Sequence, residues 1–342
     1  MYYPEFPPDC KSLLCKYLSP EIYASLKEKK TRYGFTLEQL IRSGVKNVDS
    51  GIGVYAGDEE SYELFAPLLN PIIREYHGFG PEDRHISDMD PSHLRAENPD
   101  PEEKYILSTR IRVGRNLHCF PLGPNLARRE RLIVECMVSD ALKALDGELA
   151  GEYYPLLGMD EATKRQLIED HFLFKEGDRF LEAAGLNRDW PEGRGIFHNR
   201  EKTFLVWVNE EDELRIISMQ PGGDIQAVFA RLAKAVEELQ KQLTFAFSER
   251  LGYITSCPTN LGTAMRASVH IKLPRLGAKM EAFKAITDRY DLQIRGIHGE
   301  HSESEGGVYD ISNKRRLGIT EVQAVQQMAD GVVALIEAEK KL

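Results

Sequence analysis

Apolar residues with helical spacing dominate the first part of the chain. Over residues 59–75 the following apolar side chains fall mostly on one helical face: Tyr62, Phe65, Leu68, Leu69, Ile72 and Ile73. Asp58 is placed to cap this helix, and two shorter helices are predicted to begin at Ser19 and Thr36, which are both good N-cap residues. Residues 1–80 therefore predict a small all-helical unit.

From residue 102 onward, strand-like runs alternate with helix-like runs. The predicted strands cover residues 104–113, 203–208, 213–219, 253–256, 268–273, 292–297 and 307–311, and the predicted helices cover 126–145, 160–172, 225–243, 280–290 and 320–342. The polar tetrapeptide 209–212 between two of these strands suits an antiparallel hairpin.

We therefore predict an α+β fold in two domains. An N-terminal helical domain (1–80) is joined by a linker rich in proline and acidic residues (81–101) to a large domain (102–342). In the large domain we expect a mainly antiparallel β-sheet flanked by helices.

The composition narrows the class of protein. Lysine and arginine number 44 against 54 aspartates and glutamates, a net charge of −10, which argues against a nucleic-acid or anionic-membrane partner. The five cysteines (Cys10, Cys15, Cys119, Cys136 and Cys257) are scattered and suggest neither a disulfide framework nor zinc ligands. With no signal-peptide pattern and no apolar run of membrane-spanning length, we expect a cytoplasmic protein.

Arginines on the predicted strands are the first candidate chemistry. Arg110 and Arg112 alternate along one strand, so both guanidinium groups point to the same face. Arg215, Arg266 and Arg295 lie on three other strands. Five such forked cations would suit a nucleoside triphosphate if they converged, although any one alone is more often a surface charge. No Gly-x-x-x-x-Gly-Lys-Ser/Thr motif offers another phosphate site.

A long motif around Cys257 points to a family. The motif begins with Cys257-Pro258-Thr259-Asn260-Leu261-Gly262-Thr263 and continues without a gap to Pro274. This run resembles the cysteine signature of the ATP:guanidino phosphotransferases, the phosphagen kinases. Further blocks similar to that family occur in the expected order at residues 108–115, 195–199, 203–212, 217–220 and 305–313. The resemblance covers nearly the whole chain and identifies residues 102–342 as the catalytic domain.

The resemblance implies roles for the strand arginines and for several histidines. Arg110, Arg112, Arg215, Arg266 and Arg295 match positions that hold the nucleotide phosphates. The positions beside the nucleotide and its ribose are matched by His171, His270, His301 and Asp310. Mg²⁺ is expected to arrive on the phosphates of ATP or ADP, without protein ligands of its own.

Two carboxylates match the paired acids of the family. Glu211 lies in the predicted hairpin turn, and Glu300 lies in a polar loop flanked by glycines. A guanidinium, with a pKa of about 13.8, must lose a proton to attack phosphorus, and two carboxylates can orient it and accept that proton. Cys257 is expected to touch the same group as a thiolate near cations and the Thr259 hydroxyl, and to be the most reactive of the five cysteines.

A glycine-rich loop between two N-terminal helices bears on the guanidino substrate. The residues Ser50, Gly51, Ile52, Gly53, Val54 and Tyr55 resemble the short specificity loop of the arginine kinases. Backbone N–H groups in such a loop form a concavity suited to an α-carboxylate, and Tyr55 could add a hydroxyl contact. The loop that follows Arg295 departs from the family pattern, because Ile297 and His298 replace a common threonine and arginine.

The resemblance thus implies reversible phosphoryl transfer between ATP and L-arginine, giving ADP and phosphoarginine for cellular ATP buffering. A taurocyamine or other guanidino-compound kinase is the alternative within the family. A protein-arginine kinase would not need the carboxylate loop, and a non-catalytic nucleotide-binding scaffold would be expected to lack the acids, the cysteine or the arginines. Asp49 and Arg179 match an ion pair that spans the two domains in arginine kinases. Both a monomer and a homodimer remain open.

Overall fold

The computed structural model describes residues 3–296 and 306–342. Its α-helices are α1 (Leu13–Tyr17), α2 (Pro20–Leu26), α3 (Leu37–Lys46), α4 (Ser61–Leu64), α5 (Ala66–His77), α6 (Arg128–Lys143), α7 (Glu161–Glu169), α8 (Arg179–Ala184), α9 (Ile225–Gln240), α10 (Pro274–Gly277), α11 (Met280–Arg289) and α12 (Glu321–Lys341). Its strands are β1 (Ile106–Arg115), β2 (Gly151–Pro155), β3 (Gly195–Asn199), β4 (Phe204–Val208), β5 (Leu214–Pro221), β6 (Phe247–Ser248), β7 (Gly252–Tyr253), β8 (Met265–Lys272), β9 (Leu292–Arg295) and β10 (Val308–Asn313). Short 3₁₀ helices occur at η1 (Pro91–His93), η2 (Gly147–Leu149) and η3 (Pro258–Asn260).

The N-terminal helices begin at the caps that the sequence predicts. The Ser19 hydroxyl accepts the N–H of Ile22, and Thr36 forms a reciprocal capping box with Gln39. The single helix predicted over residues 59–75 is wrong, because the chain breaks at Phe65 into α4 and α5. Pro67 explains the break, since its ring cannot donate the helical hydrogen bond and would clash with the carbonyl one turn earlier.

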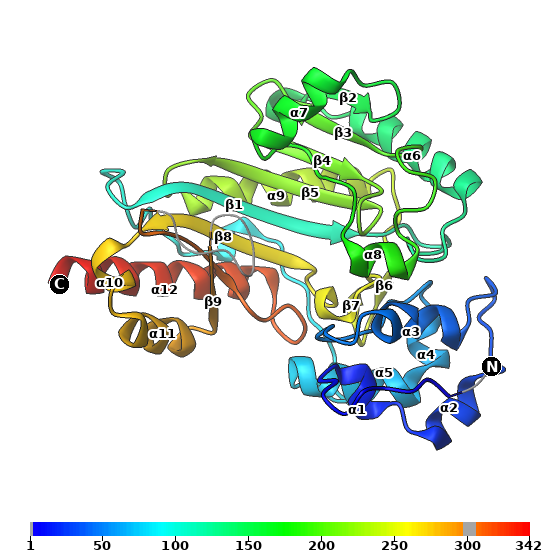
Figure 1. The fold of residues 1–342 in the computed structure, drawn as a ribbon. Coiled ribbons are helices and arrows are strands. Elements are labelled where there is room, and N and C mark those ends of the chain that lie inside the picture. Colours follow the sequence, from blue (N-terminus) through cyan, green and yellow to red (C-terminus); the bar gives the residue numbers. More distant parts are fainter. Residues whose placement is uncertain (1–2, 297–305) are drawn as a thin grey trace.

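The large domain is built on an eight-stranded sheet with strand order β2-β3-β4-β5-β1-β8-β10-β9. Neighbouring strands within it are antiparallel, which confirms the α+β class (Figure 1). The strands β2 and β3 were not predicted, and the strand predicted over 253–256 is wrong beyond its first residue. There the short β7 pairs with β6 and forms isolated bridges to Gly262, and the chain then turns into the Cys257-Pro258 segment.

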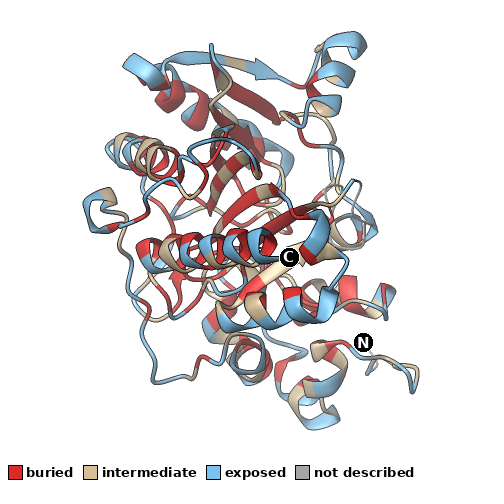
Figure 2. Ribbon diagram, turned by 90° about the vertical axis from the view of Figure 1, so that its left-hand side faces the viewer, coloured by how far each residue is buried: buried red, intermediate tan, exposed pale blue. Residues whose placement is uncertain are grey.

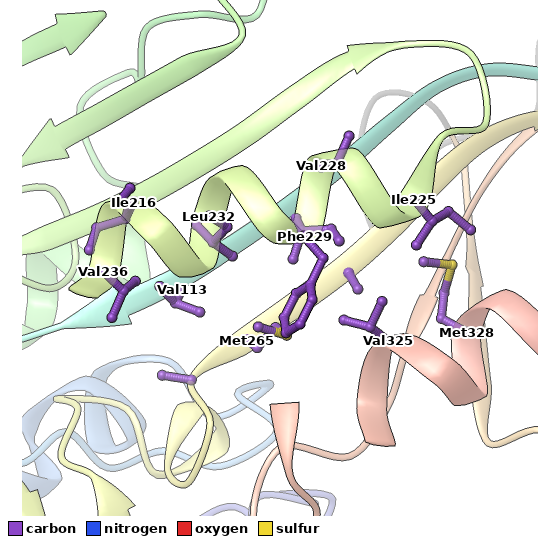
Figure 3. Close-up of a cluster of buried hydrophobic side chains, with 14 of the residues drawn as sticks. Val113, Ile216, Ile225, Val228, Phe229, Leu232, Val236, Met265, Val325 and Met328 are labelled. Atoms are coloured by element: carbon purple, nitrogen blue, oxygen red, sulfur yellow. The ribbon is translucent and has the colours of Figure 1, made fainter. Parts of the chain in front are cut away.

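One face of the sheet is buried under helices, and the other carries polar side chains on β1, β8 and β10 and a smaller apolar cluster over β3, β4 and β5. Along β1, Ile111 and Val113 are fully buried, whereas Arg110 and Arg112 are only partly buried on the opposite face. Figure 3 shows Phe229 and its neighbours on α9 beside Met265 of β8 and side chains of α12. The long α12 is buried on one side and exposed on the other (Figure 2). Burial of the apolar face stabilises the sheet, and the sheet in turn holds the arginines in place on its opposite face.

The small helical domain packs against the end of the sheet, near α8 and the β6–β7 hairpin (Figure 1). The N–H of Ala56 donates to the carbonyl of Ser256 at 2.7 Å, and the Tyr62 hydroxyl donates to the carbonyl of Thr255 at 2.8 Å. Cys257 itself belongs to the apolar cluster of the helical domain. The glycine-rich loop and the cysteine turn are thereby held close together.

Candidate active site

A pocket of about 360 Å³ opens on the polar face of the sheet. The cross-strand register explains which side chains meet there: Arg112 lies opposite Arg266, and Asp310 lies opposite both His270 and Arg295. The predicted nucleotide-site residues that line it are Arg110, Arg112, His171, Arg266, His270, Arg295 and Asp310. The strand pairing thus brings together side chains that are up to 200 positions apart.

The pocket carries an excess of positive charge. Burial, together with the nearby charges of Arg215 and Arg266, lowers the pKa of Arg110 to about 10. Burial and the same kind of repulsion hold the pKa of Arg112 well below its usual range. Among the described residues, the Nε and Nη2 atoms of Arg110 have no hydrogen-bond partner. Partly buried cations that repel one another and keep unused donors indicate a site for a multiply charged anion.

Asp310 is one of two acidic residues that line this pocket, the other being Asp170. It accepts a hydrogen bond from Arg266 at 2.6 Å, and its carboxylate lies 3.2 Å from Nε2 of His270. Burial raises the pKa of Asp310, but the contacts with His270 and Arg266 outweigh burial and lower it. One carboxylate therefore orients two of the side chains that line the pocket.

Arg215 lies beside the pocket, against two carboxylates. Its guanidinium is 3.0 Å from Glu210 and 3.1 Å from Glu211, in a largely buried cluster. The Trp207 ring lies 5.3 Å from the guanidinium carbon of Arg110 and 5.7 Å from that of Arg215. Arg215 thus links the cationic pocket to Glu211, and the aromatic ring supports both cations.

Glu211 is held in a setting that favours its protonated form. Its side chain is only 16% exposed, and it accepts a hydrogen bond from the Asn260 amide at 3.3 Å. Burial raises the pKa of Glu211 to about 7, although the positive charge of Arg215 opposes the shift. A carboxyl group that titrates near neutrality is suited to accept a proton during a reaction.

Cys257 lies next to Glu211, in a setting that favours its protonated thiol when no substrate is bound. Its sulfur is 3.1 Å from the Thr259 hydroxyl, the contact expected from the sequence. However, burial and the negative charge of Glu211 raise the pKa of Cys257 to about 12, despite the hydrogen bonds from Thr259. In the ligand-free protein the protonated thiol is therefore favoured, because the sulfur is buried among apolar side chains and beside a carboxylate, and the thiolate stays a prediction for the complex with a guanidino substrate.

The glycine-rich loop presents unused N–H groups. Its carbonyls at Gly51 and Ile52 accept hydrogen bonds from the start of α1, and the N–H of Ser50 donates to Asn47 at 2.9 Å. Within the described part of the chain, no hydrogen bond uses the N–H groups of residues 51–54. Ser50 is thus engaged inside the loop, which removes its N–H from the predicted concavity, whereas the next four remain candidates.

Tyr55 closes this loop beside the cysteine and the carboxylate. Burial raises the pKa of its phenol, and the charges of Cys257 and Glu211 raise it further. The phenol therefore stays protonated and can donate a hydrogen bond to a ligand between the loop and Glu211.

Asp49 and Arg179 form an ion pair across the domain boundary. The Nη1 atom of Arg179 donates to Oδ1 of Asp49 at 2.9 Å and to Asn47 at 3.0 Å, and its Nη2 contacts Oδ2 of Asp49. The hydrogen bond from Arg179 lowers the pKa of Asp49. Both side chains are more than half exposed, so the pair alone adds little stability.

Comparison with known proteins identifies the family. Residues 8–74 match the model of the ATP:guanido phosphotransferase N-terminal domain, and residues 133–342 match that of the C-terminal catalytic domain. The chain belongs to the ATP:guanido phosphotransferase family. Both matches fall within the predicted domains 1–80 and 102–342, whose limits stay predictions.

Relatives of this phosphotransferase include arginine kinases. It is 58% identical over 340 residues to an arginine kinase of Anthopleura japonica, covering 98% of this chain but only 47% of that one. It is 56% identical to an arginine kinase of Penaeus monodon, covering 98% of this chain and 94% of the relative.

Solved structures of the family share the fold. A lombricine kinase matches with a TM-score of 0.92 and 42% identity, covering 96% of this chain and 92% of its own. A duplicated taurocyamine kinase of Schistosoma mansoni, bound to transition-state analogue components, matches with a TM-score of 0.91 and 49% identity, covering 97% of this chain and 47% of its own.

Several site residues of this phosphotransferase were not predicted. Arg316 donates to the Thr259 carbonyl at 3.1 Å and contacts the Asn260 amide, which in turn contacts Glu211. Asn260 lies inside the cysteine signature, and Trp207 lies in the family-like block at residues 203–212, so the sequence motifs could have indicated both. Arg316 had only a basic cluster at residues 314–316. The predicted Glu300 and His301, like Ile297 and His298, lie outside the described residues.

Neither a protein-held metal nor a membrane span is found in the described part of the phosphotransferase. Its residues contain no group of three or more His, Cys, Asp or Glu side chains placed to hold a metal ion. None of the described helices is long and apolar enough to cross a membrane.

Proposed function

We propose that this phosphotransferase is an arginine kinase, which reversibly transfers the γ-phosphoryl group of ATP to L-arginine. The observation that carries the proposal is the position of Glu211. On one side its carboxylate meets Arg215 at the edge of the cationic pocket, and on the other it lies beside Cys257 and Tyr55. A proton acceptor at this junction can act on a nucleophile placed between a bound phosphate and the glycine-rich loop.

The cationic pocket suits the phosphates of a nucleotide. The unused donors of Arg110 and the forked guanidinium of Arg266 can hold phosphate oxygens, and Arg215 can stabilise negative charge that develops near Glu211. The cationic lining fits the phosphates, and its described residues offer no ligand set for a metal of its own, so Mg²⁺ would be held by the nucleotide, where it would neutralise further phosphate charge.

The neighbouring site suits a guanidino group. Glu211 can orient the planar nitrogens and accept the proton that a guanidinium must release. The positive charge of such a substrate would also offset the burial that raises the pKa of Cys257. Glu300 is proposed as the second carboxylate, and in this arrangement Cys257 orients the substrate and does not attack it.

The glycine-rich loop is proposed to select L-arginine by its α-carboxylate. The N–H groups of residues 51–54 are free to receive it, and the Tyr55 hydroxyl can add a contact. The left-handed φ of 81° at Gly53 helps to shape the loop, and a β-carbon at that position would lie 2.9 Å from Leu14 Cβ. A side chain at Gly53 would therefore displace the concavity.

A coupled assay with ATP, Mg²⁺ and a panel of guanidino compounds tests this proposal. L-Arginine should be the best substrate, and agmatine, which lacks the carboxylate, should be nearly inert. Creatine and glycocyamine should be poor, since a misplacement of about 1 Å can cost on the order of 100-fold. Equal or greater activity with taurocyamine would overturn the choice of arginine and favour the activity named for the Schistosoma mansoni relative.

A further inference from the structure

Two cysteines lie near the glycine-rich loop at the N-terminal side: Cys10 contacts the segment just before the loop, and Cys15 lies in α1. Both Cys10 and Cys15 are half-buried free thiols. The sulfur of Cys10 lies 3.5 Å from the Ser12 hydroxyl and 3.3 Å from the carbonyl of Val48, two residues before the loop. The N–H of Cys15 donates to the same Ser12 hydroxyl at 3.1 Å, which caps α1. The Ser12 hydroxyl therefore contacts both the Cys10 thiol and the backbone N–H of Cys15.

The two thiols differ in acidity. Burial raises the pKa of Cys10, but hydrogen bonds from Ser12 and from the Cys15 side chain outweigh burial and lower it. Burial and the neighbouring Cys10 raise the pKa of Cys15. Cys10 is thus the more readily ionised thiol. Cys15 stays protonated, and each of the two side chains affects the pKa of the other. This pairing of an attacking thiol with a second thiol is typical of oxidant-sensitive sites.

The first turn of α1 holds the loop directly. The N–H groups of Leu13 and Leu14 donate to the carbonyls of Gly51 and Ile52, each at 3.0 Å. The contact between Leu14 and Gly53 is so close that it leaves no room for a β-carbon. A covalent link between residues 10 and 15 would span this turn, so its strain would act on the same hydrogen bonds that position the loop.

We propose that Cys10 and Cys15 form a redox site that a hydroperoxide closes to a disulfide, which displaces the loop at residues 50–55. The consequence for arginine affinity rests on the proposed function. Disulfide geometry requires the two Cβ atoms to approach within about 3.5–4.5 Å, and both sulfurs must turn toward each other. Cys10 then gives up its contact with Val48, and the Ser12 cap is disturbed.

The chemistry consumes one peroxide for each disulfide. The Cys10 thiolate attacks a peroxide oxygen, so an S–O bond forms, the O–O bond breaks, and the departing oxygen leaves as water (or alcohol) after taking a proton. The Cys15 sulfur then attacks the Cys10 sulfenic acid. An S–S bond forms, the S–O bond breaks, and a water leaves with the Cys15 proton. Two thiols are oxidised, and the peroxide is reduced.

Peptide mapping tests the bond without any assay of activity. The full chain is treated with hydrogen peroxide, blocked, and cleaved with trypsin, which cuts after Lys11 and after Lys16. The disulfide should therefore join two separate peptides that come apart on reduction, and the intact mass should fall by two hydrogens. Cys10→Ser and Cys15→Ser should each abolish the linked pair. The double variant Cys119→Ser/Cys136→Ser, at exposed thiols elsewhere, should keep it.

Hydrogen exchange and kinetics test the effect on the loop. Oxidation should speed exchange of the Leu13 and Leu14 amides, and it should raise KM for L-arginine by about tenfold, the cost of one charge-assisted hydrogen bond. KM for Mg-ATP should change little, and dithiothreitol should reverse both effects. Cys10→Ser and Cys15→Ser should be insensitive to peroxide.

Three outcomes would overturn the proposal. They are a first oxidation at Cys257 or at the control cysteines, a stable sulfinic acid at Cys10 without the linked peptides, or linked peptides with unchanged amide exchange and unchanged KM for the guanidino substrate. Failure of the arginine assignment would show separately, in the substrate panel of the fully reduced enzyme, before any oxidant is added.

Discussion

Replacing Glu211 by glutamine should stabilise the fold while it damages catalysis. Burial raises the pKa of this carboxyl from its ordinary 4.5 to about 7. At about 1.36 kcal/mol for each pKa unit, keeping the group ionised in the folded protein costs roughly 3 kcal/mol. Because the folded-state pKa is the higher one, the stabilising contribution is complete below about pH 4.5 and is lost as the pH rises through about 7.

Glutamine resembles the protonated form at every pH, so the variant escapes this loss. Its advantage in unfolding free energy should grow between about pH 5 and pH 8 and approach the full roughly 3 kcal/mol, less what Arg215 loses with its partner. Arg215 retains Glu210 at 3.0 Å, which limits that loss.

Urea unfolding of the ligand-free protein at about pH 5 and about pH 8 measures the effect. The matched control is Glu249→Gln, at a glutamate that is 86% exposed and should show no such gain. In the coupled assay, Glu211→Gln and Glu300→Gln should each slow turnover by about 10²–10⁴-fold with little change in Mg-ATP binding. A stability gap that does not depend on pH, or a Glu211 variant less stable at about pH 8, would refute the account of the buried carboxyl. Near-normal turnover in both variants would refute the two-carboxylate mechanism.

Three further predictions concern the arginine pocket, the cysteine and the ion pair. Arg266→Lys should lower turnover, because lysine lacks the forked guanidinium that can contact Asp310 and a phosphate together, so the bound nucleotide is stabilised less in the transition state. A fully active lysine variant would show that a positive charge at this position is enough for catalysis. Cys257→Ala should reduce turnover without abolishing it, and in the ligand-free protein Cys257 should be alkylated more slowly than Cys10, as mass-spectrometric labelling can show. Asp49→Gly and Arg179→Gly should each lower affinity for L-arginine, and the double variant should cost less than the sum in a double-mutant cycle. Strict additivity would mean that the two side chains do not act together.

Local sequence determined much of the fold and of the site. Alternation along 108–113 placed Arg110 and Arg112 on one face, and the polar turn at 209–212 joins two antiparallel strands as predicted. Helix caps at Ser19 and Thr36 were predicted because they depend on groups only three residues apart. The cysteine signature was sufficient by itself to indicate the family, because it is one continuous run of residues.

Other features depended on the tertiary structure. The pairing of β1 with β8, which sets Arg112 opposite Arg266, joins segments that are far apart in the chain. The raised pKa values of Glu211 and Cys257 follow from burial between two domains, and the contact of Cys10 with Val48 follows from the docking of the N-terminal segment. A sequence pattern indicates which side chains share a face. Which faces meet, and how much water is excluded between them, is decided by long-range packing, and that exclusion sets the charge state of the groups that do the chemistry.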